Sequence, residues 1–301
     1  MTTKTLTMLR KFFLTLTLAA LTACSAPASS STSGLLAVVA TTSLIGDVAR
    51  QIGADRVFVN VLLPIGADPH AFEPRPQDVA ALTDADLVLV NGLGLEATLQ
   101  PLLGNARTIV TVSDGINALP FAEEEGGLDP HVWQDPNNVI VWAHNIADAF
   151  TRADPAHADE YASNAETYIA ELTALDAWIK EQVAQIPEAN RKLVTDHEDF
   201  GYFTARYGFE QIGAVVPSVS TGSAPSAQEL AALENAIRSS GVKAVFVGST
   251  VSPDLSRRVA EDTGVRLVFL FTDSLSPAGG DAESYLAFMR HNVNAIVEAL
   301  R

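Results

Sequence analysis

Short apolar runs alternate with helical patterns from residue 35 to the end of this 301-residue chain. Near-continuous hydrophobic strands separated by helices are typical of parallel sheets that are covered on both faces. We therefore expect an α/β fold with parallel sheets. Strands are predicted at 35–42, 57–63, 87–90, 108–112, 192–195, 210–216, 244–248 and 266–271, and helices at 44–52, 78–82, 95–103, 137–150, 227–239 and directly after Pro253.

A much longer helix, predicted at 155–185, interrupts this alternation and separates two halves. Its apolar residues recur every three or four positions, so that one face is apolar over about 30 residues. They are Tyr161, Ala165, Tyr168, Leu172, Leu175, Trp178, Ile179 and Val183, which we interpret as packing residues. The predicted organisation is a signal peptide at 1–23, a flexible tether at 24–34, an N-terminal α/β lobe at 35–153, a linking helix at 154–187 and a C-terminal α/β lobe at 188–301.

The first 24 residues have the pattern of an export signal. Lys4, Arg10 and Lys11 form a basic leader, and a short apolar core follows at 12–21. That core is shorter than the roughly 20 residues that a membrane-spanning helix needs. The sequence Leu-Thr-Ala-Cys then resembles the lipobox of bacterial lipoproteins, which predicts a lipid anchor on Cys24. A plain signal peptide with an incidental cysteine is the alternative.

Cysteine content and charge exclude several kinds of site. Cys24 is the only cysteine of the chain, so it can form no intramolecular disulfide, zinc ribbon or cysteine-based catalytic pair. The chain has 19 basic and 36 acidic residues, and removal of the three basic residues of the signal leaves 16 against 36, a net charge of −20. Nucleic acid is therefore not an expected ligand.

Two loops carry the same tripeptide, Asp-Pro-His. His70 ends the first one, shortly after the strand predicted at 57–63, and His131 ends the second. The proline narrows the backbone freedom of each loop, and the carboxylate can orient a ring nitrogen, as the outer partners of metal ligands do. A single histidine of this kind is usually an ordinary surface residue. When two histidines occur in the same short motif, a metal site becomes about as well supported as two ordinary surface residues.

The second half repeats this placement of polar residues after strands. His197 follows the strand predicted at 192–195, and Asp273 follows the strand at 266–271. Ligands of parallel sheets bind beyond the carboxyl ends of the strands. His70, His131, His197 and Asp273 thus form a candidate set for a four-coordinate divalent ion, in which the nitrogens favour zinc and the oxygen tolerates manganese. Four protein ligands leave no position for a reactive water, which favours carrying the ion over catalysis.

Other polar features are interpreted as structural. The Asn-Gly-Leu-Gly sequence at 91–94 has too few glycines in register for a dinucleotide loop and is predicted to be a strand-to-helix turn. His144, His157 and His291 share no motif with another donor and are expected to be surface or packing residues. The three glutamates at 123–125 are predicted to form an exposed turn. Gathering of cations near the mouth of a site is the alternative role for that turn.

These motifs together resemble the bacterial ZnuA/TroA-like family (cluster A-I) of zinc and manganese solute-binding lipoproteins of ABC importers. The resemblance runs from about residue 36 to the C-terminus, and its most specific segments are 64–74, 129–136, 195–208 and 272–275. It implies two Rossmann-like lobes that are joined by one long backbone helix, with the ion held at the lobe interface.

The resemblance assigns His70, His131, His197 and Asp273 as metal ligands. Histidine at 197 favours zinc, because family members that prefer manganese often have glutamate there, and manganese stays the alternative. The family also implies a non-enzymatic, extracytoplasmic protein that is anchored to the membrane through Cys24 and passes its ion to an ABC permease with its ATPase. We expect it to be a monomer.

The chain departs from the family pattern at several positions. Many zinc-specific members carry a long His-rich acidic loop where this chain has only the glutamates at 123–125. Asp199 stands where a small residue is usual, and Gly248 and Ser249 end a strand where relatives often have glutamate.

Two other classes of function are weighed against the carrier. One is a metallohydrolase that uses the same four donors, but the sequence has no His-Glu-x-x-His motif and no nucleophile elbow. The other is an adhesin or scaffold, whose binding to a partner would survive the loss of all four donors.

Overall fold

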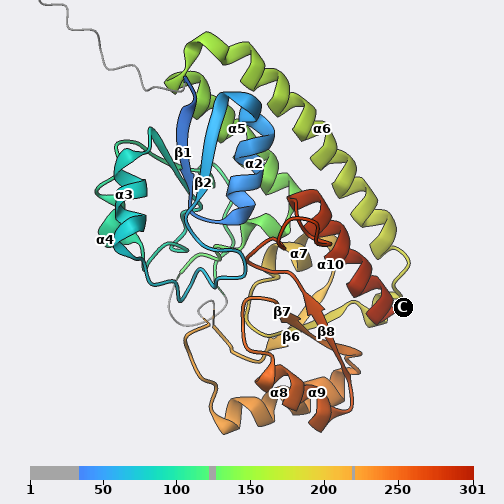
Figure 1. Cartoon of the computed structure of the whole chain (residues 1–301). Helices are drawn as coiled ribbons and strands as arrows, with labels where there is room; N and C mark the ends of the chain where they lie inside the picture. Colours follow the sequence, from blue (N-terminus) through green and yellow to red (C-terminus); the bar gives the residue numbers. More distant parts are fainter. Residues whose placement is uncertain (1–33, 122–126, 219–220) are drawn as a thin grey trace, which may run out of the picture. The chain divides into compact units, whose positions relative to one another are not determined.

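The structure is a computed structural model that describes residues 34–121, 127–218 and 221–301 (Figure 1). Leu36–Arg301 make up one contact unit, and Met1–Leu35 make up another, of which only Gly34 and Leu35 are described. The predicted signal peptide, Cys24 and the glutamates at 123–125 lie outside the described residues.

The first half contains a four-stranded parallel sheet with the strand order β2-β1-β3-β4. Alternate side chains of its strands point to opposite faces, so that Val38 and Ala40 contact one core cluster while Val39 contacts another. The first cluster includes residues of α2 and α5, and the second includes residues of α3 and α4. The elements are β1 (Leu36–Ala40), α2 (Ser43–Gly53), β2 (Val57–Val61), α3 (Pro76–Asp84), β3 (Leu87–Val90), α4 (Gln100–Leu103), β4 (Ile109–Thr111) and α5 (Pro136–Ala153).

The second half is built from two parallel strand pairs, β5 with β6 and β7 with β8, and β5 also contacts β7. Its strands are β5 (Lys192–Thr195), β6 (Glu210–Ala214), β7 (Ala244–Gly248) and β8 (Arg266–Leu270), and its helices include α7 (Gly201–Tyr207), α8 (Ala227–Ser240) and α9 (Asp254–Thr263). A capping box begins α8, in which Ser226 and Glu229 exchange bonds of 2.6 and 3.2 Å. Gly241 ends that helix with a φ of 68°.

The long helix is α6 (Ala158–Val183), which is drawn in yellow-green in Figure 1. It contacts α2, α5 and α10 (Tyr285–Leu300). The predicted packing role of its apolar face is confirmed, because Tyr161 and Tyr168 are buried in the largest core cluster and Trp178 packs against it. That cluster also includes Phe200 and Phe246 of the second half, so one hydrophobic core serves both halves. Short 3₁₀ segments are η1 (Ala54–Arg56), η2 (Val132–Gln134), η3 (Pro155–His157) and η4 (Glu188–Asn190).

Two expectations about local structure were wrong. The helix predicted at 95–103 is only Gln100–Leu103, and turns occupy the residues before it. Leu93 and Gly94 have φ angles of 56° and 90°, outside the helical range, and the Glu96 carboxylate bonds the backbone at 91 and 92. His131 was grouped with donors that follow strands, but the strand before it, β4, ends far upstream at Thr111.

Candidate metal centre

The loop that carries His70 leaves the first sheet at the carboxyl end of β2. The Asp68 carboxylate accepts the backbone N–H of His70 at 2.8 Å, which closes a turn that the intervening proline also restricts. Gly66 adopts a φ of 78°, and its N–H donates to the Ser274 hydroxyl at 2.8 Å. The His70 loop is therefore tied to the C-terminal half of the chain.

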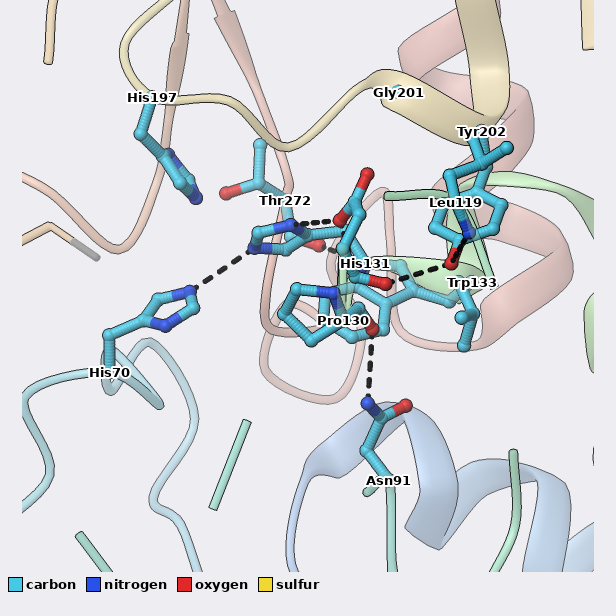
Figure 2. A network of polar contacts seen from close by, with 12 residues as sticks. His70, Asn91, Leu119, Pro130, His131, Trp133, His197, Gly201, Tyr202 and Thr272 are labelled. Atoms are coloured by element: carbon cyan, nitrogen blue, oxygen red, sulfur yellow. Dashed lines mark hydrogen bonds and ion pairs between the residues drawn. The ribbon is translucent and has the colours of Figure 1, made fainter. Parts of the chain in front are cut away.

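His131 is fully buried and its loop is held by more bonds. Asp129 Oδ1 accepts both the backbone N–H of His131, at 2.9 Å, and the ring Nδ1, at 2.8 Å. The proton on Nδ1 leaves Nε2 as the coordinating atom. Two neighbours hold the loop, since the Tyr202 hydroxyl donates to the Asp129 carbonyl at 2.8 Å and the Asn91 amide donates to the Pro130 carbonyl at 3.0 Å (Figure 2).

Gly201, the first residue of α7, lies against the carboxylate that orients His131. A Cβ atom at this position would lie 2.5 Å from Asp129 Oδ2. Real side chains do not approach so closely, so any larger residue would displace Asp129 or the helix. Gly201 thus leaves the space that Asp129 needs in order to orient the ring of His131.

His197 follows β5 and is held by the residue before it. Asp196 Oδ1 accepts the backbone N–H of His197 at 2.7 Å and its ring Nδ1 at 2.9 Å. Asp196 Oδ2 accepts the N–H of Gly248 at 2.7 Å. A Cβ at Gly248 would lie 2.3 Å from Thr272 Oγ1, so this departure from the family pattern leaves room for the hydroxyl of Thr272.

Asp273 follows β8 and is buried. Its Oδ2 accepts the hydroxyls of Thr250, at 2.7 Å, and Thr272, at 3.1 Å. The carbonyl of Thr272 accepts the indole N–H of Trp133 at 2.9 Å, which links this loop to the segment that follows His131. Asp273 is therefore fixed on one oxygen by hydroxyls and offers the other.

The structure brings all four predicted donors together. The ligand atoms of His70, His131, His197 and Asp273 all lie within 4.8 Å of one another. Nε2 of His70 is 3.2 Å from Nε2 of His131, and the three imidazole centroids are 5.2 to 5.7 Å apart (Figure 2). Among the described residues, His197 Nε2 and Asp273 Oδ1 are buried without a hydrogen-bond partner. A divalent cation would satisfy both atoms, so the donor set fits such an ion.

Burial and neighbouring charges set the protonation of His70 and Asp273. Burial is the main cause, together with repulsion by His131, that lowers the pKa of His70 to about 3. Burial alone would raise the pKa of Asp273, but the imidazoles of His197, His131 and His70 and the hydroxyl of Thr250 hold it below its usual value. A neutral imidazole and an ionised carboxylate are the forms that coordinate a cation.

Asp199 lies beside His197 and changes its electrostatics. Burial lowers the pKa of His197, but Asp199 and Asp196 outweigh this effect and raise it well above its usual value. Burial raises the pKa of the Asp199 carboxyl. Asp199 is fully buried, and neither of its carboxylate oxygens has a hydrogen-bond partner in the described part of the chain.

Sequence reasoning missed the residues whose hydrogen bonds hold the donor loops in place. Glu96 is buried and accepts the Thr41 hydroxyl at 2.9 Å and the backbone N–H groups of Asn91 and Gly92 at 2.6 and 3.0 Å. It holds the predicted strand-to-helix turn, which is confirmed as a turn, and thereby places Asn91 against the His131 loop. A glutamate within an apolar segment is a usable signal for such a role. Thr250 and Thr272, which donate to Asp273, have no comparable feature in the sequence that would indicate their role.

Among the described residues, the remaining histidines belong to no cluster of possible metal donors. His144 is exposed on α5. His157 pairs with Asp154 at 2.6 Å, and His291 packs edge-on against Phe271.

The comparison with protein families decides the assignment. The family described as "ZnuA: Zinc-uptake complex component A periplasmic" matches residues 38–299. The chain belongs to the ZnuA family.

Several characterised proteins resemble this ZnuA-family chain over most of its length. The manganese-binding lipoprotein MntA of Halalkalibacterium halodurans is 37% identical over 268 residues, which cover 88% of each chain. The periplasmic zinc-binding protein TroA from Treponema pallidum has a TM-score of 0.84 at 30% identity, with 89% of this chain and 99% of TroA covered. The Mn-bound periplasmic metal-binding protein from Candidatus Liberibacter asiaticus has a TM-score of 0.81 at 30% identity, with coverages of 88% and 100%.

These likenesses confirm the predicted family and the parallel α/β fold with its long helix. They also confirm an extracytoplasmic location, because the relatives are lipoproteins of metal ABC transporters. The chain is a substrate-binding protein of this transporter class. No helix in the described ranges has both the length and the apolar character to cross a bilayer. The metal ligands, the lipidation of Cys24 and the lobe boundaries stay predictions.

Proposed function

We propose that this ZnuA-family protein captures a divalent transition-metal ion outside the cytoplasm with His70, His131, His197 and Asp273. The observation that carries the proposal is the convergence of these donors, which come from four separate loops, to within 4.8 Å. Two of them have buried atoms without a partner in the described residues, as expected of atoms that await a cation.

We further propose that zinc and manganese bind at this one site. Three imidazoles favour zinc, and the Asp273 carboxylate is a donor that manganese accepts. The relatives support both ions, since TroA is named for zinc whereas MntA is named for manganese and the Liberibacter protein was solved with manganese. Manganese therefore fits the site at least as well as zinc.

Delivery of the ion would take place at the membrane. In this proposal the lipid on Cys24 anchors a monomeric carrier, and the segment at 24–34 tethers it within reach of the permease and ATPase of an ABC importer. We take the folded part to be the lobes at 35–153 and 188–301 with the linking helix at 154–187. This division is supported by the separate sheets of the two halves.

Release is proposed to involve local movement of the donor loops. Residues of both halves share one buried cluster that also includes α6, so that wide separation of the halves would expose much of this core to water. The loops of His197 and Asp273 lie at strand ends, where such rearrangement disturbs the core least.

A metal-dependent hydrolase is the second class of function that the same donors could serve. We propose binding instead, because four protein ligands saturate a tetrahedral ion and leave no position for an activated water. The relatives named above are likewise binding proteins. An adhesin that uses another surface would retain its partner after all four donors were replaced.

Metal analysis of the full chain, purified without added ions, tests the proposal. We expect one tightly held zinc or manganese ion per chain, and competition titration should show that each ion displaces the other. His144→Ala is the matched control, because this histidine is exposed and lies outside the donor cluster. Absence of any bound divalent ion, or two ions that bind without competition, would contradict the proposal.

A further inference from the structure

Asp199 is a buried acid whose environment the four-donor site does not explain. Its side chain is 0% exposed, and neither carboxylate oxygen has a hydrogen-bond partner among the described residues. Its backbone N–H donates to the His197 carbonyl at 3.1 Å. Buried carboxylates are normally hydrogen-bonded, paired with a cation or bound to a metal.

The neighbouring acidic side chains differ from Asp199, because each has hydrogen-bond partners for at least one carboxylate oxygen. Asp196 has both oxygens bonded, one to His197 and the other to the N–H of Gly248. Asp129 accepts two bonds from His131, and Asp273 has one oxygen bonded to two threonine hydroxyls. In the described part of the chain no lysine or arginine forms an ion pair with Asp196, Asp199 or Asp273.

Asp199 is also close to the donor cluster. Asp196, His197 and Asp199 each offer a ligand atom within 4.8 Å of the other two, and His197 belongs to both this set and the set of four donors. Asp199 is not a member of the set of four, so its side chain must turn for an oxygen to reach an ion held there. No hydrogen bond from the described residues opposes that rotation.

We propose that Asp199 is a fifth donor to the transported ion, and that this second carboxylate shifts the selectivity of the site from zinc toward manganese. The proposal rests on the ion-binding function proposed above. Zinc is satisfied by four ligands in a tetrahedron and prefers nitrogen and sulfur. Manganese suits carboxylate oxygen and binds weakly to nitrogen sites that zinc prefers, so an added carboxylate favours manganese.

The competing interpretation is that Asp199 only balances the charge of His197. In that case, removing the Asp199 carboxylate would act only through His197, which binds both ions, and would change the affinities for zinc and manganese by similar factors. A direct bond from Asp199 predicts unequal factors and a change in the number of ligands around the ion. The ratio of the two affinities therefore separates the interpretations.

The test compares the full chain with Asp199→Asn, which keeps the volume and removes the charge, and Asp199→Ala, which restores a small residue. Dissociation constants for Mn²⁺ and Zn²⁺ are measured by chelator competition. We expect both variants to lose about tenfold or more in manganese affinity and less than about threefold in zinc affinity. Asp47→Asn is the control, because Asp47 is a buried carboxylate outside the cluster, with its oxygens bonded to Tyr285 and Gln51.

X-ray absorption of the manganese-loaded protein gives a direct readout of the number of ligands around the ion. We expect five nitrogen or oxygen ligands in the wild type and one fewer in Asp199→Asn. Four ligands in the wild type, or equal changes for both ions in the variants, would overturn the role of Asp199 while leaving the carrier function intact. Failure of the wild type to bind either ion would instead reject the proposed function.

Discussion

The two halves of the protein supply two of the proposed donors each, and they differ in how their buried carboxylates are bonded. In the N-terminal half, Asp68 and Asp129 bond the backbone of the histidine that each precedes, at 2.8 and 2.9 Å. In the C-terminal half, Asp199 and one oxygen of Asp273 are buried without a hydrogen-bond partner among the described residues. Asp196 holds His197 as Asp129 holds His131, so the histidines of both halves are fixed by the protein. The difference lies in the carboxylate oxygens of Asp199 and Asp273 that have no hydrogen-bond partner in the described residues and that a cation would satisfy.

The largest effect is expected from removing one imidazole from each half. His131→Ala and His197→Ala should each weaken binding by more than about a hundredfold, beyond the loss that outer partners of a ligand typically cause. Chelator competition measures the change, with His144→Ala as the control. Unaltered affinity in His197→Ala alone would show that the N-terminal half binds the ion without the other half.

The carboxylates that orient the histidines are expected to matter less. Asp129→Asn and Asp196→Asn weaken the bond to the ring Nδ1 of His131 and His197, and each should reduce affinity by about ten- to a hundredfold. Asp47→Asn controls for the loss of a buried charge. Equal affinities of the variants and the wild type would mean that ring orientation is set by packing alone.

Gly201→Ala tests the contact between the C-terminal half and the His131 loop. The new Cβ would lie 2.5 Å from Asp129 Oδ2, so we expect a loss of about 1 to 3 kcal/mol in the free energy of unfolding and up to about tenfold in affinity. Gly104→Ala is the matched control, because a Cβ there meets nothing within 4 Å. Denaturant unfolding of both variants gives the comparison, and similar stabilities would contradict the close approach.

The smallest change in ion affinity is expected from replacing Asp176 on α6, because none of its hydrogen-bond partners is one of the four donors. It accepts bonds from Arg206 at 2.9 and 3.0 Å, Lys180 at 2.7 Å and Tyr207 at 3.0 Å. Burial alone would raise its pKa, but these partners lower it to about 2. Allowing for the partly exposed cations, Asp176→Asn should cost about 1 to 2 kcal/mol of stability with little change in affinity.

The pH dependence of this contribution follows from the direction of the shift. A carboxyl with a lowered pKa in the folded state stabilises the protein above its ordinary pKa of 3.8 and loses this contribution as the pH falls toward about 2. The stability difference between the wild type and Asp176→Asn should therefore shrink over that range in unfolding experiments. A difference that stays constant down to pH 2 would contradict the role of the charge.

Much of the fold could be predicted because buried parallel strands leave a strong pattern. The predicted bounds of β3, β5 and β7 matched the observed ones. The apolar runs of β3 and β7 stand out because polar residues flank them, namely Asp86 and Asn91 for β3 and Lys243 and Ser249 for β7. The helix predicted at 95–103 was too long, because the residues before Gln100 form a turn that the buried Glu96 holds. The apolar spacing does not show that the Glu96 carboxylate is buried, where it bonds the backbone of Asn91 and Gly92 and the distant Thr41 hydroxyl.

The candidate site was predictable to the level of its donors and no further. The repeated Asp-Pro-His tripeptides led to His70 and His131, and placement after strands led to His197 and Asp273. The roles of Thr250, Gly201 and Asp199 depend on which segments meet in three dimensions. Asp199 was visible as a departure from the family pattern, but its lack of partners could be seen only in the structure.

Anomalous diffraction from crystals of the full chain, recorded at the manganese and zinc absorption edges, tests most directly whether the two halves share one ion. We predict a single anomalous peak bonded to His70 and His131 of the N-terminal half and to His197 and Asp273 of the C-terminal half. A peak bonded to donors of one half only, or located away from all four residues, would contradict it.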